Sequence, residues 1–540
     1  MTRTNIAGLT LFVALAVAPI RAQNEPETKV DAVFTRWTAT TPGCSVGVST
    51  NGKPVLAKAY GMADLERNVR NAPETIFEAG SVSKQFTAAA VLLLVRDGKL
   101  SLDDPVRKHI PELPDYKVPL TIRHMLNHTS GLRDWGNVAA IGGWPRTTRV
   151  YTHAHVLEIV SRQKGLNFTP GTRWSYSNSG YNLSAILVAR VSGMSFAEFT
   201  RKRIFEPLGM TRTSWRDDHK RIVKDRAVAY EPDTVSGFRT DMPFENVHGN
   251  GGLLTTVGDL LKWNENFVNP VVGDAAFVSD QQRPGRFNDG RAHGYALGLF
   301  IATYKGLPEV SHSGATAGYR AHLTRFPEQR VSVAVLCNAG NANATQYTNQ
   351  VADLYLAGHL KPPAPSPAYT LSAAEIAAIE GLYRNKATGV PGRLIRDKDA
   401  VRIERGPALL AQSGTRMTTA GGQTWEFDGR GAVKVTDPYG TVDHWERVTP
   451  AKPTAAQLRM LAGTYVSQEA EVTVTVAVEG DTLVLKRRPE ATGKLTPVYR
   501  DAFSGPGGLM IFRRDKAGRV REFSVVQDRV WDLRFTRKQQ

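Results

Sequence analysis

The sequence predicts an α/β (α+β) domain over residues 23–360, followed by two small all-β domains at residues 371–449 and 453–538. Three observations lead to this division. Strand-like segments stand at both ends of the first region with helical segments between them, the composition changes at a proline-rich stretch over residues 361–370, and two similar units follow that stretch. The chain has 540 residues, a length that allows two to four domains at about 150 residues each.

The first region contains a hairpin and a series of helices. Residues 44–60 alternate apolar and polar side chains around Asn51-Gly52, a pair that tolerates the positive φ angles of a tight turn, so we expect two antiparallel strands. Residues 82–97 are mostly apolar and end at Asp97-Gly98, which predicts a buried helix with a glycine cap. Further helices are expected at 119–127, 154–163, 180–192, 195–204 and 257–267, and further strands at 295–303, 320–326 and 330–337. Strands at both ends of the region predict that its two ends share one sheet.

Beyond the first region the helical signals nearly vanish. Residues 361–368 contain four prolines in eight positions, which is typical of a stiff, extended linker. Residues 371–383 then resemble residues 453–465, with a matched Gly-x-Tyr, and each unit ends in an aromatic segment. Many short strands in a unit of this length favour a small β-barrel. We therefore interpret the second half of the chain as a duplicated β-barrel-like unit.

Residues 1–22 have the pattern of a secretory signal peptide. Arg3 supplies positive charge, an almost wholly apolar run follows over residues 6–20, and Ala22 offers a small residue at a cleavage point. The run is shorter than the ~20 apolar residues of a membrane span, although an uncleaved anchor is the alternative. Since no later apolar stretch is long enough, we expect a secreted or periplasmic protein without integral membrane association.

The only two cysteines, Cys44 and Cys337, leave two interpretations open. Thiols of an exported chain meet an oxidising compartment, where they can pair as a disulfide. The sequence does not place them within bonding distance, so two small buried apolar side chains are the alternative.

The chain is basic, with a formal net charge of +17. Its lysines and arginines are scattered along the whole length, without a long basic run or a nucleic-acid-binding motif. A solvated basic surface is the better interpretation, and the expected partner is a small-molecule or peptide substrate rather than nucleic acid. The sequence does not indicate the oligomeric state.

The residues from Ser81 to Lys84 contain a candidate for acyl transfer, which needs a nucleophile, a base and donors for the oxyanion. Residues at i and i+3 lie on one helical face, so the two side chains can touch. Burial and the positive end of a helix both disfavour an ammonium group, so we expect the pKa of Lys84 to fall until the neutral amine accepts a proton. A serine three residues before a lysine occurs often by chance, so further motifs are needed to assign a function to Ser81 and Lys84.

Three motifs follow one another: Phe77-Glu-Ala-Gly-Ser-Val-Ser-Lys84, Tyr176-Ser-Asn178 and His312-Ser-Gly314. In this order they resemble the motifs of the serine β-lactamase and penicillin-binding protein superfamily, specifically its class C-like branch, which includes D-aminopeptidases, DD-peptidases and esterases. The resemblance covers about residues 30 to 360. It implies a β-lactamase/DD-peptidase-like domain with an antiparallel sheet, a helical lobe and the active site between them.

A D-aminopeptidase of this branch has the same three-domain plan. The resemblance therefore implies that the two C-terminal units are small, lipocalin-like barrel domains. In such a plan a loop from a C-terminal unit can reach the active site and restrict the substrate.

The resemblance also implies roles for single residues. Ser81 is the nucleophile, and Lys84 and Tyr176 take its proton and pass it to the leaving group, with the choice of base between them left open. Asn178 orients the acyl amide of the substrate. The backbone N–H groups of Ser81 and Ala315 form the oxyanion hole.

The third motif narrows the function. His312, Ser313 and Gly314 bind the substrate, and the histidine stands where true class C β-lactamases have a lysine. Histidine is mostly neutral at pH 7, which argues against efficient β-lactam hydrolysis. The resemblance implies hydrolysis of amide bonds through an acyl-enzyme, with peptides or amides of D-amino acids as the first substrate class. Alternatives are a carboxylesterase on small acyl esters and a weak β-lactamase or penicillin-binding sensor. No metal or organic cofactor is implied.

Overall fold

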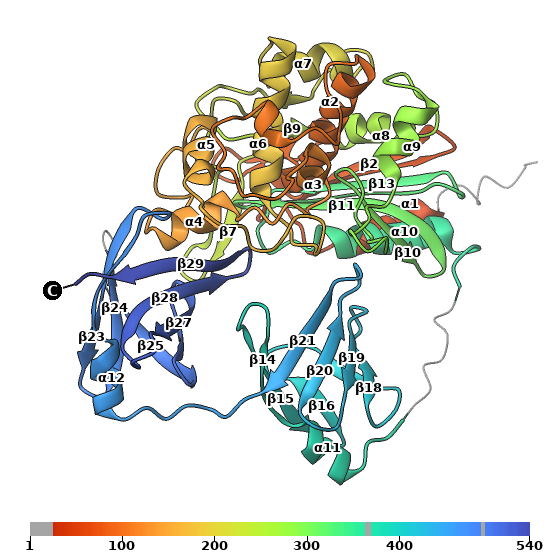
Figure 1. Ribbon diagram of the computed structural model, residues 1–540. Coiled ribbons are helices and arrows are strands. Elements are labelled where there is room, and N and C mark those ends of the chain that lie inside the picture. Colours follow the sequence, from red (N-terminus) through yellow and green to blue (C-terminus); the bar gives the residue numbers. More distant parts are fainter. Residues whose placement is uncertain (1–24, 362–368, 488–491, 540) are drawn as a thin grey trace, which may run out of the picture.

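The computed structural model describes residues 25–361, 369–487 and 492–539, and it consists of three parts. The N-terminal domain, residues 25–361, carries nearly all of the helices, and two barrels lie side by side below it in Figure 1. The expected signal peptide at residues 1–22 and most of the proline-rich linker lie outside the described residues.

A six-stranded antiparallel sheet forms the centre of the N-terminal domain. Its order is β10-β11-β12-β13-β1-β2. The strands are β1 (Cys44–Thr50), β2 (Lys53–Tyr60), β10 (Phe300–Tyr304), β11 (Leu307–Thr316), β12 (Tyr319–Phe326) and β13 (Val331–Cys337). The first and last of these strands along the chain, β1 and β13, pair in antiparallel fashion. The prediction that the two ends of this region share one sheet is therefore confirmed.

Helices cover both faces of the sheet. On one face α1 (Glu25–Val33) and α10 (Ala344–Leu356) pack against each other and the sheet. On the other face α8 (Val257–Glu265) packs on the sheet beside a helical lobe centred on α2 (Lys84–Arg96) and α6 (Asn178–Ser192). Figure 1 shows this lobe above the sheet and α1 and α10 beneath it.

The remaining elements of the N-terminal domain are short. The helices are α3 (Ile122–Leu126), α4 (Trp135–Ile141), α5 (His153–Ser161), α7 (Phe196–Thr200) and α9 (Ala275–Gln282), with 3₁₀ turns at Gly80–Ser83 and Val106–Lys108 and a π turn at Arg201–Phe205. The strands are β3 (Met62–Asp64), β4 (Val69–Arg70), β5 (Phe77–Glu78), β6 (Ser214–Trp215), β7 (Tyr230–Asp233), β8 (Gly237–Thr240) and β9 (Leu253–Thr255).

The expected helix at 82–97 is α2, with one correction at its start. A 3₁₀ turn over Gly80–Ser83 precedes it, and the α-helix itself begins at Lys84. It ends at Arg96, and Gly98 has the positive φ of 69° expected of a glycine cap. The expected strand at 295–303 is wrong over its first half, because β10 begins only at Phe300.

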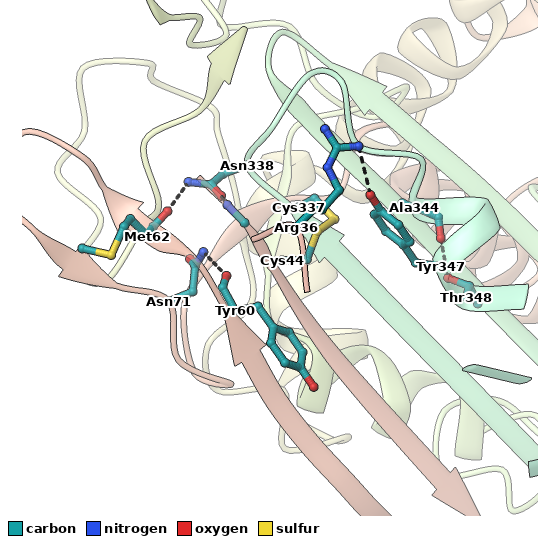
Figure 2. The surroundings of a disulfide bond; sticks show 11 residues. Arg36, Cys44, Tyr60, Met62, Asn71, Cys337, Asn338, Ala344, Tyr347 and Thr348 are labelled. Carbon is teal, nitrogen blue, oxygen red and sulfur yellow. Dashed lines mark hydrogen bonds between the residues drawn. A yellow bond between two sulfur atoms is a disulfide. The ribbon is translucent and has the colours of Figure 1, made fainter. Parts of the chain in front are cut away.

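A disulfide joins Cys44 to Cys337 (Figure 2). The two cysteines face each other across β1 and β13 and are fully buried, which decides between the two interpretations left open by the sequence. Beside the bond, the Asn338 side chain accepts from Gly43 N at 2.8 Å and donates to Met62 O at 3.0 Å. The disulfide thus fixes the strand end from which the chain continues into the loop before α10.

Each C-terminal unit is a short helix followed by a closed, antiparallel eight-stranded barrel whose strands pair in sequence order. The first has α11 (Ala373–Ile379), then β14 (Gly381–Asn385), β15 (Pro391–Asp397), β16 (Ala400–Ile403), β17 (Ala408–Ala411), β18 (Arg416–Thr418), β19 (Thr424–Phe427), β20 (Ala432–Thr436) and β21 (Val442–Arg447). The second has α12 (Ala455–Leu461), then β22 (Gly463–Ser467), β23 (Val472–Glu479), β24 (Thr482–Arg487), β25 (Thr492–Tyr499), β26 (Ala502–Gly505), β27 (Gly508–Arg514), β28 (Val520–Gln527) and β29 (Val530–Arg537).

Equivalent contacts recur in the two barrels. Tyr383 donates its hydroxyl proton to Ile379 O, and Tyr465 donates to Leu461 O, both at 2.8 Å. Each tyrosine therefore ties the first strand of its barrel to the preceding helix. This agreement supports the predicted duplication, while likeness to lipocalins stays a prediction.

No single helix in the described part of the chain is long and apolar enough to cross a bilayer; the bent pair Asn178–Ser192 and Phe196–Phe205 qualifies by combined length and composition alone.

Replacing both Cys44 and Cys337 by alanine should lower the free energy of unfolding by about 2–4 kcal/mol, because the cross-link restricts the unfolded chain. The measurement is the midpoint of urea unfolding, followed by tryptophan fluorescence, in oxidising buffer. Wild type under strong reductant is the control and should approach the variant. An unchanged midpoint in the variant would contradict a stabilising role for the bond.

Candidate active site

Ser81 lies in the 3₁₀ turn that leads into α2. Side chains at i and i+3 eclipse one another in a 3₁₀ turn, so Ser81 and Lys84 face each other. Lys84 Nζ lies 3.1 Å from Ser81 Oγ. The turn is held by Ser83, whose hydroxyl donates to Gly80 O at 2.5 Å and accepts from Leu253 N at 3.1 Å. The correction to the start of the helix therefore preserves the contact expected from the spacing.

Lys84 is fully buried, and its amine has two further partners. Nζ donates to Asn178 Oδ1 at 2.9 Å and to Asn250 O at 2.6 Å. A neutral amine has two N–H donors and one lone pair, so these two acceptors leave the lone pair for the Ser81 hydroxyl proton. Burial, reinforced by the positive charge of Arg529, holds the pKa of Lys84 well below its usual value. The arrangement suits a general base.

Tyr176 lies next to the Lys84 amine. Lys84 Nζ is 4.8 Å from the centroid of its ring, and the ring also packs on His128 with centroids 4.2 Å apart. Burial raises the pKa of the Tyr176 phenol, although a hydrogen bond with Ser81 and the charge of Arg529 oppose the shift. The phenol therefore keeps its proton at neutral pH, which favours Lys84 as the base and Tyr176 as a proton donor and relay.

Two glycines allow the turn at Gly80–Ser83 to contact β11. A Cβ on Gly80 would lie 2.6 Å from Ala315 N, and a Cβ on Gly314 would lie 3.0 Å from Ser81 N. Gly80 also has a positive φ of 50°. This close approach places the segments that carry the backbone N–H groups of Ser81 and Ala315 next to each other, and their role as an oxyanion hole stays a prediction.

His312 lies on β11 and is 2% exposed. Its Nδ1 is 2.6 Å from Ser313 O, which only accepts, so Nδ1 carries the proton. Nε2 is then the acceptor for the Tyr295 hydroxyl, 3.1 Å away. Burial and the nearby Lys84 lower the pKa of His312 to about 3. The histidine is neutral at pH 7 and supplies no fixed positive charge.

These side chains surround one cavity of about 740 Å³. Its lining comes from the turn at Gly80–Ser83, α6, strands β10 to β12, the loop before α10 and the second barrel, among others. The predicted residues in it are Ser81, Tyr176, Asn178, His312, Ser313, Gly314 and Ala315. Lys84 lies behind Ser81, buried within the domain. In the described part of the chain no three His, Cys, Asp or Glu side chains are grouped to hold a metal ion.

Both barrels reach this site with the hairpin formed by their last two strands. In the first barrel, Tyr439 at the β20–β21 turn packs against Trp174 and Phe300, with centroid distances of 4.8 and 5.3 Å. Both of these aromatic residues line the cavity. In the second barrel, Arg529 at the β28–β29 turn lines the cavity itself. The geometry therefore supports the hypothesis that a C-terminal unit limits access, and it extends the hypothesis to both units.

Hydrogen bonds fix the second hairpin to the N-terminal domain. Arg133 donates to Trp531 O at 3.1 Å and to Asp532 O at 3.0 Å, and its charge is paired with Glu469 at 2.9 Å. The Asn167 amide donates to Arg529 O at 3.0 Å. The backbone around Arg529 is thus held independently of the arginine side chain.

The residues that sequence reasoning missed are those placed by tertiary contacts. Asn250 directly precedes a glycine pair, Gly251-Gly252, which was the one available signal for a tight loop at this point. Asp134 accepts from Asn178 N at 2.8 Å and so fixes the start of α6. For Tyr439 and Arg529 no local signal exists, because only docking of the barrels brings them to the cavity.

Lys84→Met keeps the length of the side chain and removes the amine. The reaction of Ser81 with a fluorophosphonate, followed by intact-mass spectrometry, should slow by about 10²- to 10⁴-fold. In wild type the rate should rise with pH up to the lowered pKa of Lys84, and His312 should add no step of its own near neutral pH, because burial lowers its pKa to about 3. The control is Lys99→Met, at an exposed site. A Lys84→Met rate close to that of wild type would exclude the amine as base.

Tyr439→Ala should widen the cavity beside Trp174 and Phe300. We expect kcat/KM for substrates with bulky acyl groups to rise about tenfold relative to small ones, since the ring restricts space rather than taking part in the reaction. Tyr439→Phe retains the ring and should behave as wild type. The same ratio in the alanine variant as in wild type would show that the first barrel does not restrict the substrate.

Comparison with known proteins agrees with this geometry. The Beta-lactamase family model matches residues 30–357. A D-aminopeptidase of Brucella anthropi is 32% identical over 299 residues, which is 55% of this chain and 56% of that protein. A D-aminopeptidase of Gluconobacter oxydans is 30% identical over 355 residues, 65% of each chain. The alignments thus span between half and two thirds of these relatives.

A solved structure of a penicillin-binding protein homologue from Pyrococcus abyssi superposes with a TM-score of 0.56 at 25% identity, covering 79% of this chain and 100% of that one. The family match covers more than half of the chain and includes all three motifs. The chain belongs to the Beta-lactamase family of serine hydrolases.

Proposed function

We propose that the protein forms an acyl-enzyme on Ser81 and cleaves amide bonds in peptides or amides that contain D-amino acids. The observation that carries the chemistry is the set of contacts of Lys84, whose amine meets two carbonyl acceptors and, at 3.1 Å, the Ser81 hydroxyl. The D-aminopeptidases among the relatives support the substrate class. The signal-peptide pattern of residues 1–22 supports a secreted or periplasmic location.

The proposed reaction begins with proton transfer from Ser81 to the neutral amine of Lys84 as Oγ attacks the substrate carbonyl. The N–H groups of Ser81 and Ala315 stabilise the oxyanion. When the C–N bond breaks, Tyr176 gives its proton to the leaving amine and recovers one from Lys84. A water molecule then attacks the acyl-enzyme and transfers a proton to the same pair of side chains. The pair returns a proton to Ser81 Oγ as the C–O bond breaks and the acid is released.

A panel of substrates tests this function on the purified mature protein. We expect a fluorophosphonate to add once to wild type, and D-amino acid amides to turn over faster than their L-enantiomers, p-nitrophenyl esters and a chromogenic cephalosporin. Ser81→Ala should show neither labelling nor turnover. Ser101→Ala, at an exposed position, is the matched control.

The other outcomes separate the alternatives. Turnover of the esters alone would replace the proposal by a carboxylesterase. Fast opening of the cephalosporin followed by a persistent acyl-enzyme would favour a penicillin-binding sensor. Labelling that persists in Ser81→Ala would exclude Ser81 as the nucleophile.

A further inference from the structure

The charged residues that line the cavity are all cationic. They are Arg146, Arg320 and Arg529, and no described lining residue is an aspartate or a glutamate. A cavity with low-dielectric walls and charge of one sign attracts ligands of the opposite sign. The three arginines differ, however, in how far their charge is already compensated.

Two of the arginines are paired with carboxylates from outside the cavity lining. Arg146 forms a two-pronged pair with Glu245, which is buried and also contacts Arg216. Arg320 lies 3.2 Å from Glu231 and donates two further hydrogen bonds to backbone carbonyls. Their guanidinium groups are therefore largely committed within the protein.

The positive charge of Arg529 is compensated less by nearby carboxylates than the charges of Arg146 and Arg320. Its nearest carboxylate is that of its neighbour Asp528, at 3.2 Å, which is 74% exposed and therefore screened by solvent. Asp134 is 4.0 Å away, and its Oδ2 and Oδ1 already accept from Asn178 N and Gly136 N. The guanidinium of Arg529 thus retains capacity for an anion.

The position of Arg529 makes this capacity relevant to the substrate. Its guanidinium lies 4.8 Å from the centroid of the Tyr176 ring, and both residues line the cavity that opens on Ser81. The side chain is 34% exposed, so it is partly desolvated yet accessible. His312, on β11, is neutral, so it does not compete with Arg529 for an anionic group of the substrate.

We propose that Arg529, supplied by the second barrel, is a specificity-determining residue that binds a carboxylate of the substrate. The enzyme would then prefer D-amino acid peptides and amides that carry a carboxylate close to the scissile bond over those with a neutral or cationic group there. Arginine suits this role because its planar group binds a carboxylate through two parallel hydrogen bonds. The proposal rests on the proposed function, whose substrate class it narrows.

The proposal is tested by measuring ligand binding to the inactive variant Ser81→Ala, which does not turn the ligands over. Full-length Ser81→Ala is compared by calorimetry with the same protein carrying Arg529→Gln, Arg529→Lys or Arg519→Gln. Arg519→Gln removes the same charge from an exposed turn of the same barrel, outside the cavity lining. The ligand pairs are N-succinyl- and N-acetyl-D-alanine amide, and N-acetyl-D-alanyl-D-alanine and its amide. The first pair differs by a carboxymethyl extension on the acyl side of the scissile bond, and the second by a carboxylate in place of a carboxamide on the leaving-group side.

With Arg529 present, the acid of at least one pair should bind about 10- to 100-fold more tightly than its neutral partner. Arg529→Gln should remove most of this preference, Arg529→Lys should retain part of it and Arg519→Gln should retain all of it. Binding of the acids should also weaken with salt, since an ion pair is screened. Equal binding within both pairs, absent binding of both acids, or a preference that survives Arg529→Gln would overturn the proposal.

The same proteins separate this proposal from the proposed function. If wild type is not labelled at Ser81 but Ser81→Ala still prefers the acids, the proposed hydrolysis fails and the carboxylate site stands. If wild type is labelled and turns over D-amino acid amides without any preference for the acids, the hydrolysis stands and the carboxylate site fails. A rise in the pKa of Lys84 in Arg529→Gln affects all substrates alike, so the ratio within a pair isolates recognition.

Discussion

This site depends on the complete burial of one lysine amine, that of Lys84, which has lost contact with water. An ammonium group there would lose its hydration, so Lys84 is stable only as the neutral amine or with acceptors for its protons. The structure provides two acceptors, from the start of α6 and from the loop before β9, and directs the remaining lone pair at Ser81. Three segments that are distant in sequence must therefore meet at a single nitrogen atom.

The electrostatics of the site follow from the same burial. Neither His312 nor Tyr176 carries charge at neutral pH, because desolvation disfavours the charged form of both. The positive field around Lys84 comes instead from arginines, above all Arg529, which stabilises the neutral amine. Through Arg529, the second barrel thus helps to lower the pKa of Lys84 and also lines the cavity.

The features that could be predicted from the sequence depend on the spacing of nearby residues and on the order of the three motifs along the chain. The spacing of Ser81 and Lys84 implies contact in an α-helix and in a 3₁₀ turn alike, so the error at the start of α2 did not affect it. The expected strand at 295–303 failed because Tyr295 forms only an isolated bridge and directs its hydroxyl to His312. Tyr439 and Arg529 could not be predicted, because hairpin tips carry no pattern that names the surface on which they dock.

The two barrels use the same hairpin, strands seven and eight of each, at one cavity: the second barrel lines it with Arg529, and the first packs Tyr439 on the lining residues Trp174 and Phe300. Because a chain is synthesised from its N-terminus, the nucleophile, its base and the histidine strand all leave the ribosome before either hairpin tip. The residues around Ser81 therefore precede both hairpin tips along the chain, and the proposed restriction of the substrate would depend on segments that are translated after the site itself.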